Sequence, residues 1–196
     1  MNDSLPSDGH FVLWAALAEG AIGAVAVLLA WCLEVPLWSG WRVDLASAAT
    51  GLAAACPLLV VMWLVMRWPV GPFRELKMLV DEFVVPLFRA GSLADFALIS
   101  LVAGVGEELL FRGVVQRGLA ASWGPWVACG LAALLFGLCH ALNLGYCLLA
   151  TAIGAYLGWL ERATGNLLAP IIAHAVYDFL ALIYLIRIRH HQPSQH

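Results

Sequence analysis

The chain has 196 residues, of which 63% are hydrophobic and 12% are charged, and its mean hydropathy is +0.88. Soluble domains are only about half apolar, so this composition excludes an ordinary soluble protein, and so apolar a chain with a net charge of −3 does not stay disordered. Ten Lys and Arg residues against thirteen Asp and Glu residues provide no basic face, so we expect no nucleic acid partner. We therefore predict a single integral membrane domain over residues 1–196, with the lipid bilayer as its surroundings.

The N-terminal region predicts a retained membrane span. The first ten residues are polar and acidic and lack the Lys or Arg that a secretory signal needs. The apolar run from Phe11 to Leu33 is too long for the hydrophobic part of such a signal. Glu19 stands alone among Ala and Gly in this run, and we expect it to serve helix packing or an interhelical hydrogen bond.

Further apolar runs predict a polytopic membrane protein. A helix needs about twenty apolar residues to cross a hydrocarbon core of about 30 Å, and backbone polar groups in lipid must be satisfied within the helix. The runs of about this length are 11–33, 46–66, 93–119, 125–143, 145–160 and 167–187. The fifth run is short, and the third contains charged residues. The sequence thus predicts an all-α membrane helix bundle of about six transmembrane helices.

An amphipathic helix is predicted between the second and third runs, over residues 71–91. Pro72 suits a first helical position, and Pro86 limits the helix near its end. Apolar residues recur at helical spacing while charged residues occupy the other side. The apolar set is Phe73, Leu76, Val80, Phe83, Val84 and Leu87. We expect this helix to lie in the membrane interface, and a soluble helix packed on the membrane domain is the alternative.

The basic residues predict the orientation. With six crossings, one side carries Arg67, Arg74, Lys77, Arg89, Arg187 and Arg189, and the other carries Arg42, Arg117 and Arg162. Since Lys and Arg favour the cytoplasmic side, we expect both termini there. The compact, Trp-rich chain further suggests a multi-pass protein of the bacterial inner membrane.

The five cysteines suggest neither a disulfide framework nor a thiolate zinc site, because their number is odd and all lie in apolar runs. They are Cys32, Cys56, Cys129, Cys139 and Cys147. Cys139 precedes His140, but adjacent helical residues point about 100° apart, so we do not expect a thiol nucleophile.

Ionisable residues inside the spans are the candidate functional residues, because an unpaired charge in a bilayer is costly. In GEELLFRG, Glu108 and Arg112 are four residues apart and should form an ion pair, which leaves Glu107 available for chemistry. In FGLCH, Phe136 lies one turn before His140, and Gly137 permits a neighbouring helix to approach closely.

A third pattern, HAVYD, places His174 and Asp178 on one helix face. At 1.5 Å per residue, Glu107 lies roughly 18 Å, His140 roughly 22 Å, His174 roughly 12 Å and Asp178 roughly 18 Å from the turns that end their helical hairpins. These depths overlap near the middle of the bilayer, which indicates one shared site. The alternative is that each polar group only holds its own pair of helices together.

Two acids and two histidines at one depth suit hydrolysis of an amide bond. Glu107 could act as the base that activates water, and His140 could hold the water and pass protons. His174, oriented by Asp178, could donate a hydrogen bond to the oxyanion.

Other chemistries stay open at this point. The same four residues would suit zinc, although HExxH is absent. A serine mechanism would use Ser47 or Ser100, neither of which lies in a G-x-S-x-G context. A proton-coupled carrier would use such residues too, but no inverted repeat is visible.

These three motifs, in this order, resemble the CPBP family of intramembrane glutamic endopeptidases, the CAAX-protease and bacteriocin-processing group that includes the Ras-converting enzyme. The resemblance covers roughly Gly71 to Tyr184, and we assign the catalytic core to 71–187. It implies an enzyme without metal or other cofactor.

For the residues, the resemblance implies that Glu107 activates water with the partnership of His140, and that His174 stabilises the oxyanion. Glu108, Arg112 and Phe136 would support this site. The Ras-converting branch has Asn where this chain has Asp178. Since an ionised Asp donates no hydrogen bond, Asp178 must be protonated or must only orient His174.

The resemblance permits several substrates: prenylated CAAX proteins, leader or tail peptides of secreted proteins, or bacteriocins. We expect a membrane protein or a lipidated peptide. The compact chain resembles the small bacterial myxosortases. A non-catalytic membrane scaffold or a bacteriocin-immunity protein is the alternative function.

Overall fold

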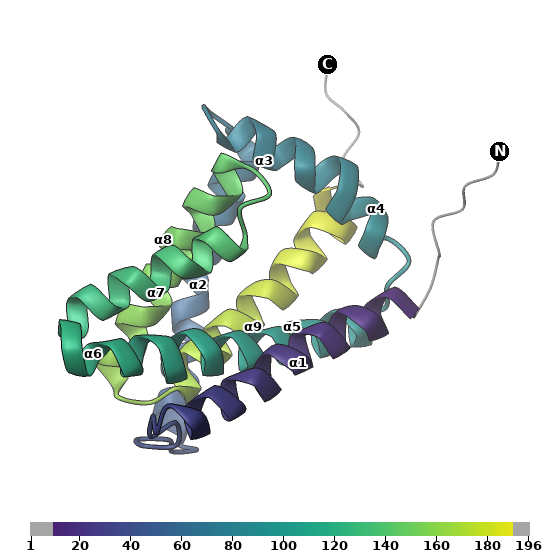
Figure 1. Cartoon of the computed structure of the whole chain (residues 1–196). Helices are drawn as coiled ribbons and strands as arrows, with labels where there is room; N and C mark the ends of the chain where they lie inside the picture. Colours follow the sequence, from purple (N-terminus) through teal and green to yellow (C-terminus); the bar gives the residue numbers. More distant parts are fainter. Residues whose placement is uncertain (1–9, 190–196) are drawn as a thin grey trace.

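The computed structural model describes residues 10–189, which fold into an all-α bundle with no strand in that range (Figure 1). The elements are α1 His10–Cys32, α2 Leu45–Arg67, α3 Phe73–Leu79, η1 Val80–Val84, α4 Val85–Phe88, α5 Leu93–Glu108, η2 Leu109–Gln116, α6 Arg117–Trp123, α7 Pro125–Cys139, α8 Leu144–Thr164, α9 Leu168–Ile183 and η3 Tyr184–Ile188, where η marks π-helical segments. The predicted all-α fold is confirmed.

Each predicted span is helical, but the predicted number of crossings is not confirmed. Within residues 10–189, four helices are long and apolar enough to cross a membrane: Val12–Cys32, Leu45–Arg67, Leu144–Thr164 and Leu168–Ile188. α7 is a shorter apolar helix. The third predicted span is one continuous helical segment divided into α5, η2 and α6, and it contains the paired acids and Arg112.

The prediction that the fifth span is short was wrong, because α8 extends through Thr164. The predicted span ends at residue 160, so the sequence analysis places Glu161 just beyond it. In the structure it is buried and accepts hydrogen bonds from the side chains of Gln116 and Arg117, so the helix continues past it. Gly165 then ends α8 in the left-handed conformation, with φ of 61°.

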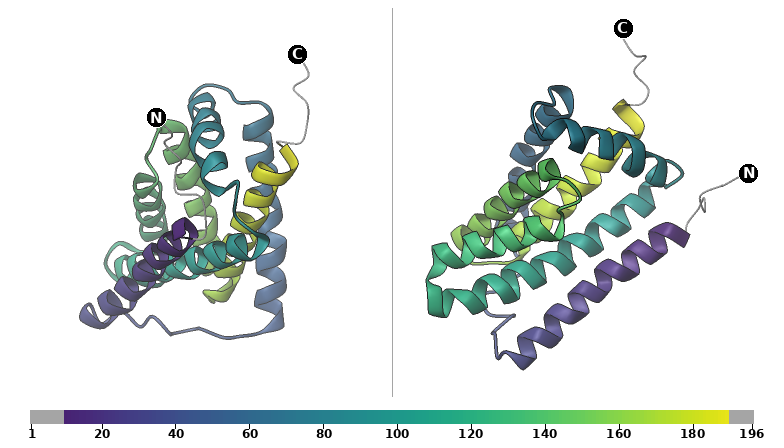
Figure 2. Two further views of the ribbon diagram at one scale, coloured as in Figure 1. Left: turned by 90° about the vertical axis from the view of Figure 1, so that its right-hand side faces the viewer. Right: turned by 45° about the horizontal axis from the view of Figure 1, so that its top comes forward.

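α9 occupies the middle of the bundle. It packs against α2 on one side and α5 on the other, and α1 covers the outer face of α5. α7 and α8 form a hairpin that contacts η2 and α9. Figure 2 shows the same order from two other sides, with α1 at the outer edge of the bundle. Residues of α5, α7 and α9 therefore face the same interior.

Small residues set the spacing of the α7–α8 hairpin. A Cβ atom added to Gly137 would lie 1.8 Å from Thr151 Oγ1 and 2.7 Å from the carbonyl oxygen of Cys147. The expected close approach of a neighbouring helix at Gly137 is confirmed.

The predicted amphipathic helix is present as α3, η1 and α4, which cross the ends of α2, α8 and α9 (Figure 1). A π-helical segment precedes Pro86, where the ring and the missing N–H disturb the α-helical hydrogen bonds, and the helix ends at Phe88. Leu76 and Val80 are buried against the bundle, whereas Phe83 is 63% exposed. The apolar side is thus shared between the bundle and the surroundings, and the interfacial location stays a prediction.

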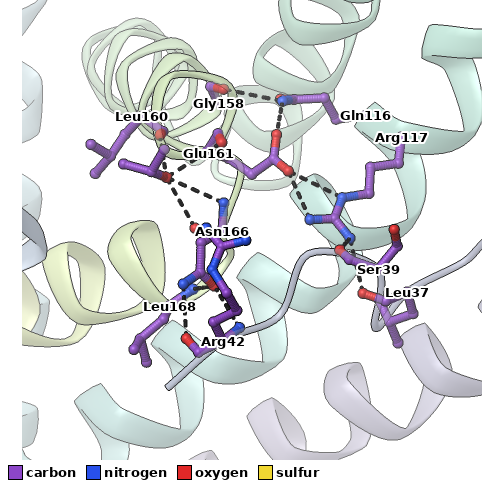
Figure 3. A network of polar contacts seen from close by, with 11 residues as sticks. Leu37, Ser39, Arg42, Gln116, Arg117, Gly158, Leu160, Glu161, Asn166 and Leu168 are labelled. Atoms are coloured by element: carbon purple, nitrogen blue, oxygen red, sulfur yellow. Dashed lines mark hydrogen bonds and ion pairs between the residues drawn. The ribbon is translucent and has the colours of Figure 1, made fainter. Parts of the chain in front are cut away.

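A polar network closes the opposite end of the bundle (Figure 3). The Arg117 guanidinium donates to Glu161 and to the carbonyl oxygens of Leu37 and Ser39. The Asn166 amide donates to the carbonyl oxygen of Arg42. These bonds tie the loop between α1 and α2 to α6 and to the turn between α8 and α9.

The same end holds Ser47, one of the two serines considered as nucleophiles. Asp44 caps α2 and accepts hydrogen bonds from the backbone N–H and the hydroxyl of Ser47, which hold the pKa of Asp44 below its usual range. Asn166 also donates to the Ser47 hydroxyl. Ser47 therefore serves the network at this end of the bundle.

Candidate active site

Glu107 and Glu108 are the last two residues of α5, and the π-helical segment η2 begins immediately after them. Both are buried, with exposed fractions of 7% and 0%. As consecutive helical residues they point in different directions. Glu108 faces Arg112, and Glu107 faces His140 and His174. Single π-helical turns inside α-helices are frequent at functional sites.

Arg112 anchors the site to α8. Its Nη1 atom lies 3.0 Å from Glu108 Oε1, so the expected ion pair is present, and its Nη2 atom donates to the carbonyl oxygen of Gly154 at 2.8 Å. The guanidinium lies over the Phe136 ring, 4.8 Å from its centroid. With Arg112 only 1% exposed, this charge is fully removed from the surroundings and compensated by Glu108.

Glu108 has a second contact that the sequence analysis did not predict. Its Oε1 atom lies 2.9 Å from His174 Nδ1. Because the carboxylate is paired with Arg112, the Nδ1–H of His174 is the donor in this hydrogen bond. Glu108 therefore fixes the orientation of the His174 ring, in addition to neutralising Arg112.

His140 is held by its own helix and by two aromatic rings. Its Nδ1 atom donates to the carbonyl oxygen of Phe136 at 2.7 Å. The ring lies 4.5 Å from the Phe136 ring and 5.3 Å from the Tyr146 ring, between centroids. Since Nδ1 is engaged with a carbonyl oxygen, Nε2 is the atom available for chemistry.

Glu107 lies between the two imidazoles. Its Oε1 atom is 3.8 Å from His140 Nε2, and its Oε2 atom is 3.8 Å from His174 Nε2. Asp178 Oδ2 lies 3.3 Å from His174 Nε2. Both Glu107 separations are longer than a direct hydrogen bond, so the carboxyl group adjoins both rings without being bonded to either.

These four residues line one cavity of about 340 Å³. The remaining walls are mainly apolar and come from α2, α3, η1, α8 and the end of α9. They include Met62, Met66, Leu76, Val80, Leu149 and Leu185. The cavity thus has two parts. The four polar residues line one part, and apolar residues beneath the amphipathic helix line the other, which we call the apolar arm.

Three further polar residues line the cavity and were not predicted for the site. Tyr146 and Tyr177 are uncharged at neutral pH, so the search for charges inside spans passed over them, although Tyr177 follows His174 by three residues on the same helix face. Glu19 was expected in packing or an interhelical hydrogen bond. Its backbone packs against Gly106 of α5, and its side chain also lines the cavity, where the Oε2 atom has no hydrogen-bond partner within residues 10–189.

Ser100 and Cys139, the other nucleophile candidates, differ in their location. Ser100 is buried and lines the cavity two turns before Glu107, whereas Cys139 is exposed. Among the described residues, no group of three or more His, Cys, Asp or Glu side chains is arranged to hold a metal ion.

Residues 89–180 match the family described as "Type II CAAX prenyl endopeptidase Rce1-like". This segment of the chain is similar to the Rce1-like endopeptidases. The match confirms the resemblance drawn from the three motifs. The Rce1-like segment contains Glu107, His140, His174 and Asp178 and does not reach α1.

Two proteins of Bacillus subtilis (strain 168) are also similar to this chain. "Uncharacterized protein YpbD" is 32% identical over 115 residues, which cover 56% of this chain and 57% of that protein. "Putative membrane peptidase YdiL" is 29% identical over 97 residues, 49% of this chain and 39% of that protein. The chain thus spans about half the length of the curated relatives it matches. No solved structure matches it. The four long apolar helices support an integral membrane protein, and the matched segments are similar to proteins described as membrane peptidases.

Proposed function

We propose that this protein is an intramembrane endopeptidase that hydrolyses a peptide bond with water activated by Glu107, without a metal ion. One observation carries the proposal: α5, α7 and α9 bring Glu107, His140, His174 and Asp178 to one buried cavity. A base, a second proton carrier and a hydrogen-bond donor within a few ångströms are what amide hydrolysis needs.

In this mechanism a water molecule binds between Glu107 and His140 Nε2. Glu107 accepts a proton from the water as its oxygen bonds to the carbonyl carbon of the substrate. His174, in its charged form with a proton on each ring nitrogen, donates a hydrogen bond from Nε2 to the oxyanion of the tetrahedral intermediate. The C–N bond then breaks, and the proton passes from Glu107, directly or through His140, to the leaving nitrogen.

Glu108 and Arg112 act as positioning residues. Glu108 holds His174 through Nδ1, and Arg112 holds Glu108 while bonding to the backbone of α8 at Gly154. Phe136 positions His140 through its carbonyl oxygen and its ring. A rigid set of supports of this kind keeps reacting groups within the narrow geometry that catalysis requires.

The substrate we propose is a membrane protein or a lipidated peptide. The apolar arm of the cavity, with Met62, Met66 and Leu185 among its walls, suits an apolar segment or a lipid-modified side chain. The enzyme acts as a multi-pass protein of the bacterial inner membrane in this proposal, with catalytic core 71–187.

The substitution Glu107→Gln tests the proposal. Membrane proteomes of cells with the wild-type chain, with Glu107→Gln and without the chain are compared for proteins whose terminus changes. We expect the change only with the wild-type chain, and a loss of about 10²–10⁴-fold in the cleavage rate of the purified variant. Glu82→Gln, the same change on an exposed residue outside the cavity, serves as the control.

Cleavage by Glu107→Gln at the wild-type rate would contradict the proposal. A non-catalytic scaffold predicts a different result: Glu107→Gln and His140→Ala would keep cellular function as long as the protein folds. Elemental analysis of the purified protein tests the metal-independent mechanism, which would be contradicted by stoichiometric zinc whose removal abolishes cleavage.

A further inference from the structure

Glu19 is a cavity residue to which the proposed mechanism gives no role. It lies on α1, outside the Rce1-like segment, and lines the cavity together with Glu107, His174 and Asp178. Its Oε2 atom is buried and accepts no hydrogen bond from residues 10–189. A buried polar atom without a partner is costly, so a partner supplied from outside the chain would be stabilising.

The packing of α1 on α5 holds Glu19 at the catalytic centre. A Cβ atom added to Gly106 would lie 2.5 Å from the backbone carbonyl oxygen of Glu19. Gly106 immediately precedes Glu107, so this close approach of the two helices brings Glu19 next to the proposed base. Glu19, Glu107 and Asp178 all line this cavity.

The charge balance of the cavity indicates the partner. Three carboxyl groups line it against two imidazoles, and no Lys or Arg is among its described lining residues. The nearby Arg112 is already committed to Glu108 and Gly154. Glu107, only 7% exposed, also has its Oε2 atom buried without a hydrogen-bond partner. A substrate that enters this site displaces water, and the buried Oε2 atoms of Glu19 and Glu107 then have no hydrogen-bond donor unless the substrate supplies one.

We propose that Glu19 is a specificity-determining residue that binds a cationic side chain, Lys or Arg, of the substrate near the scissile bond. The inference rests on the proposed function, because it requires a peptide substrate in this cavity. A cation fits better than a neutral donor, since it offsets the excess of carboxyl groups and forms the stronger, charge-assisted hydrogen bond. The place of Glu19 beside Glu107 puts this cation within a few residues of the cleaved bond.

The test uses the purified full chain and a pool of short acylated peptides with randomised positions on both sides of a central apolar segment, read by mass spectrometry. We expect the wild-type enzyme to prefer Lys or Arg close to the cleaved bond. For a selected peptide and its partner with norleucine in place of Lys, we expect the ratio of kcat/KM values to fall by about tenfold or more in Glu19→Gln. Glu82→Gln should leave this ratio unchanged.

Two further variants separate recognition from folding. Glu19→Asp keeps the carboxyl group and should retain most of the preference, whereas Glu19→Lys should reverse it toward Asp or Glu in the peptide. An equal ratio in the wild type and Glu19→Gln, with cleavage still abolished by Glu107→Gln, would overturn the role of Glu19 alone. Cleavage that persists in Glu107→Gln would instead overturn the proposed function.

Discussion

His174 is bound through both ring nitrogens, and this limits what Asp178 does. Nδ1 donates to Glu108, so in the neutral ring Nε2 carries only a lone pair, and Asp178 Oδ2 lies 3.3 Å from it. Two lone pairs do not attract, so one proton must lie between these atoms. Either His174 is charged and donates, as the proposed oxyanion role requires, or Asp178 is protonated and donates.

An amide at position 178 satisfies both cases, because it carries a donor and an acceptor. We therefore expect Asp178→Asn to keep its cleavage rate within about tenfold of the wild type. Asp178→Ala removes the partner of Nε2, and the loss of a hydrogen bond of about 2 kcal/mol corresponds to roughly thirtyfold. Initial rates on a peptide selected by the wild-type enzyme measure both effects. A larger loss in Asp178→Asn than in Asp178→Ala would contradict the positioning role.

The two contacts of Glu108 show which part of the site can be predicted from the sequence and which part cannot. Helical spacing correctly paired Glu108 with Arg112, because both lie on one helix. The contact of Glu108 with His174 joins residues 66 positions apart and depends on which faces of α5 and α9 meet. Local spacing holds no information on that choice, so this hydrogen bond could not be predicted.

Among the elements, α1 and α5 pack closely against each other beside the site. Their backbones meet where Gly106 faces the carbonyl oxygen of Glu19, and a Cβ atom on Gly23 would lie 3.3 Å from Gly106 Cα. This approach needs glycine at position 106, since any side chain there would collide with the backbone of α1. Glu19 could have been included in the site by the depth argument, but only once α1 was known to be the neighbour of α5.

Substitution of Gly106 tests this contact. In Gly106→Ala the new methyl group pushes α1 away from α5, and overpacking of this kind typically costs about 1–3 kcal/mol. We expect a lower midpoint of thermal unfolding in detergent and a weaker preference for basic peptides, because Glu19 moves with α1. Gly130→Ala is the matched control, since a Cβ there meets no atom within 4 Å. Equal unfolding midpoints for the two variants would contradict the proposed packing.

The presence of the long helices could be predicted from the sequence, but the end of α8 could not. The length of the apolar runs predicted every long helix, because a membrane-spanning helix needs about twenty apolar residues whatever the topology. The end of α8 was misplaced because Glu161 looks like a surface charge until its partners Gln116 and Arg117 are known. These partners lie 45 and 44 residues away, on η2 and α6.

Across the whole molecule, the two ends of the bundle have different chemistry. The cavity draws its apolar arm from the side covered by α3 and η1, where Leu76 and Val80 form part of its wall. The other end is closed by the polar network of Arg117, Glu161 and Asn166 (Figure 3). The network fixes loop and helix ends at one side, so we expect any motion that admits substrate to occur at the other side.

Substitution of the Arg117–Glu161 pair tests whether the end closed by the polar network is separate from the substrate site. Both side chains are largely buried, at 16% and 9% exposure, with 2.8 Å between Arg117 Nη2 and Glu161 Oε1. Arg117→Ala leaves Glu161 as a buried charge without its cation, which typically costs about 3–5 kcal/mol. The double variant Arg117→Met with Glu161→Met replaces the pair by apolar side chains and should recover most of this loss. Thermal unfolding measures the stability of these variants, and cleavage at temperatures below the unfolding range measures the state of the site.

Because the pair closes the end away from the cavity, the double variant should cleave with an unchanged KM. A raised KM would show that the closed end also shapes the substrate site.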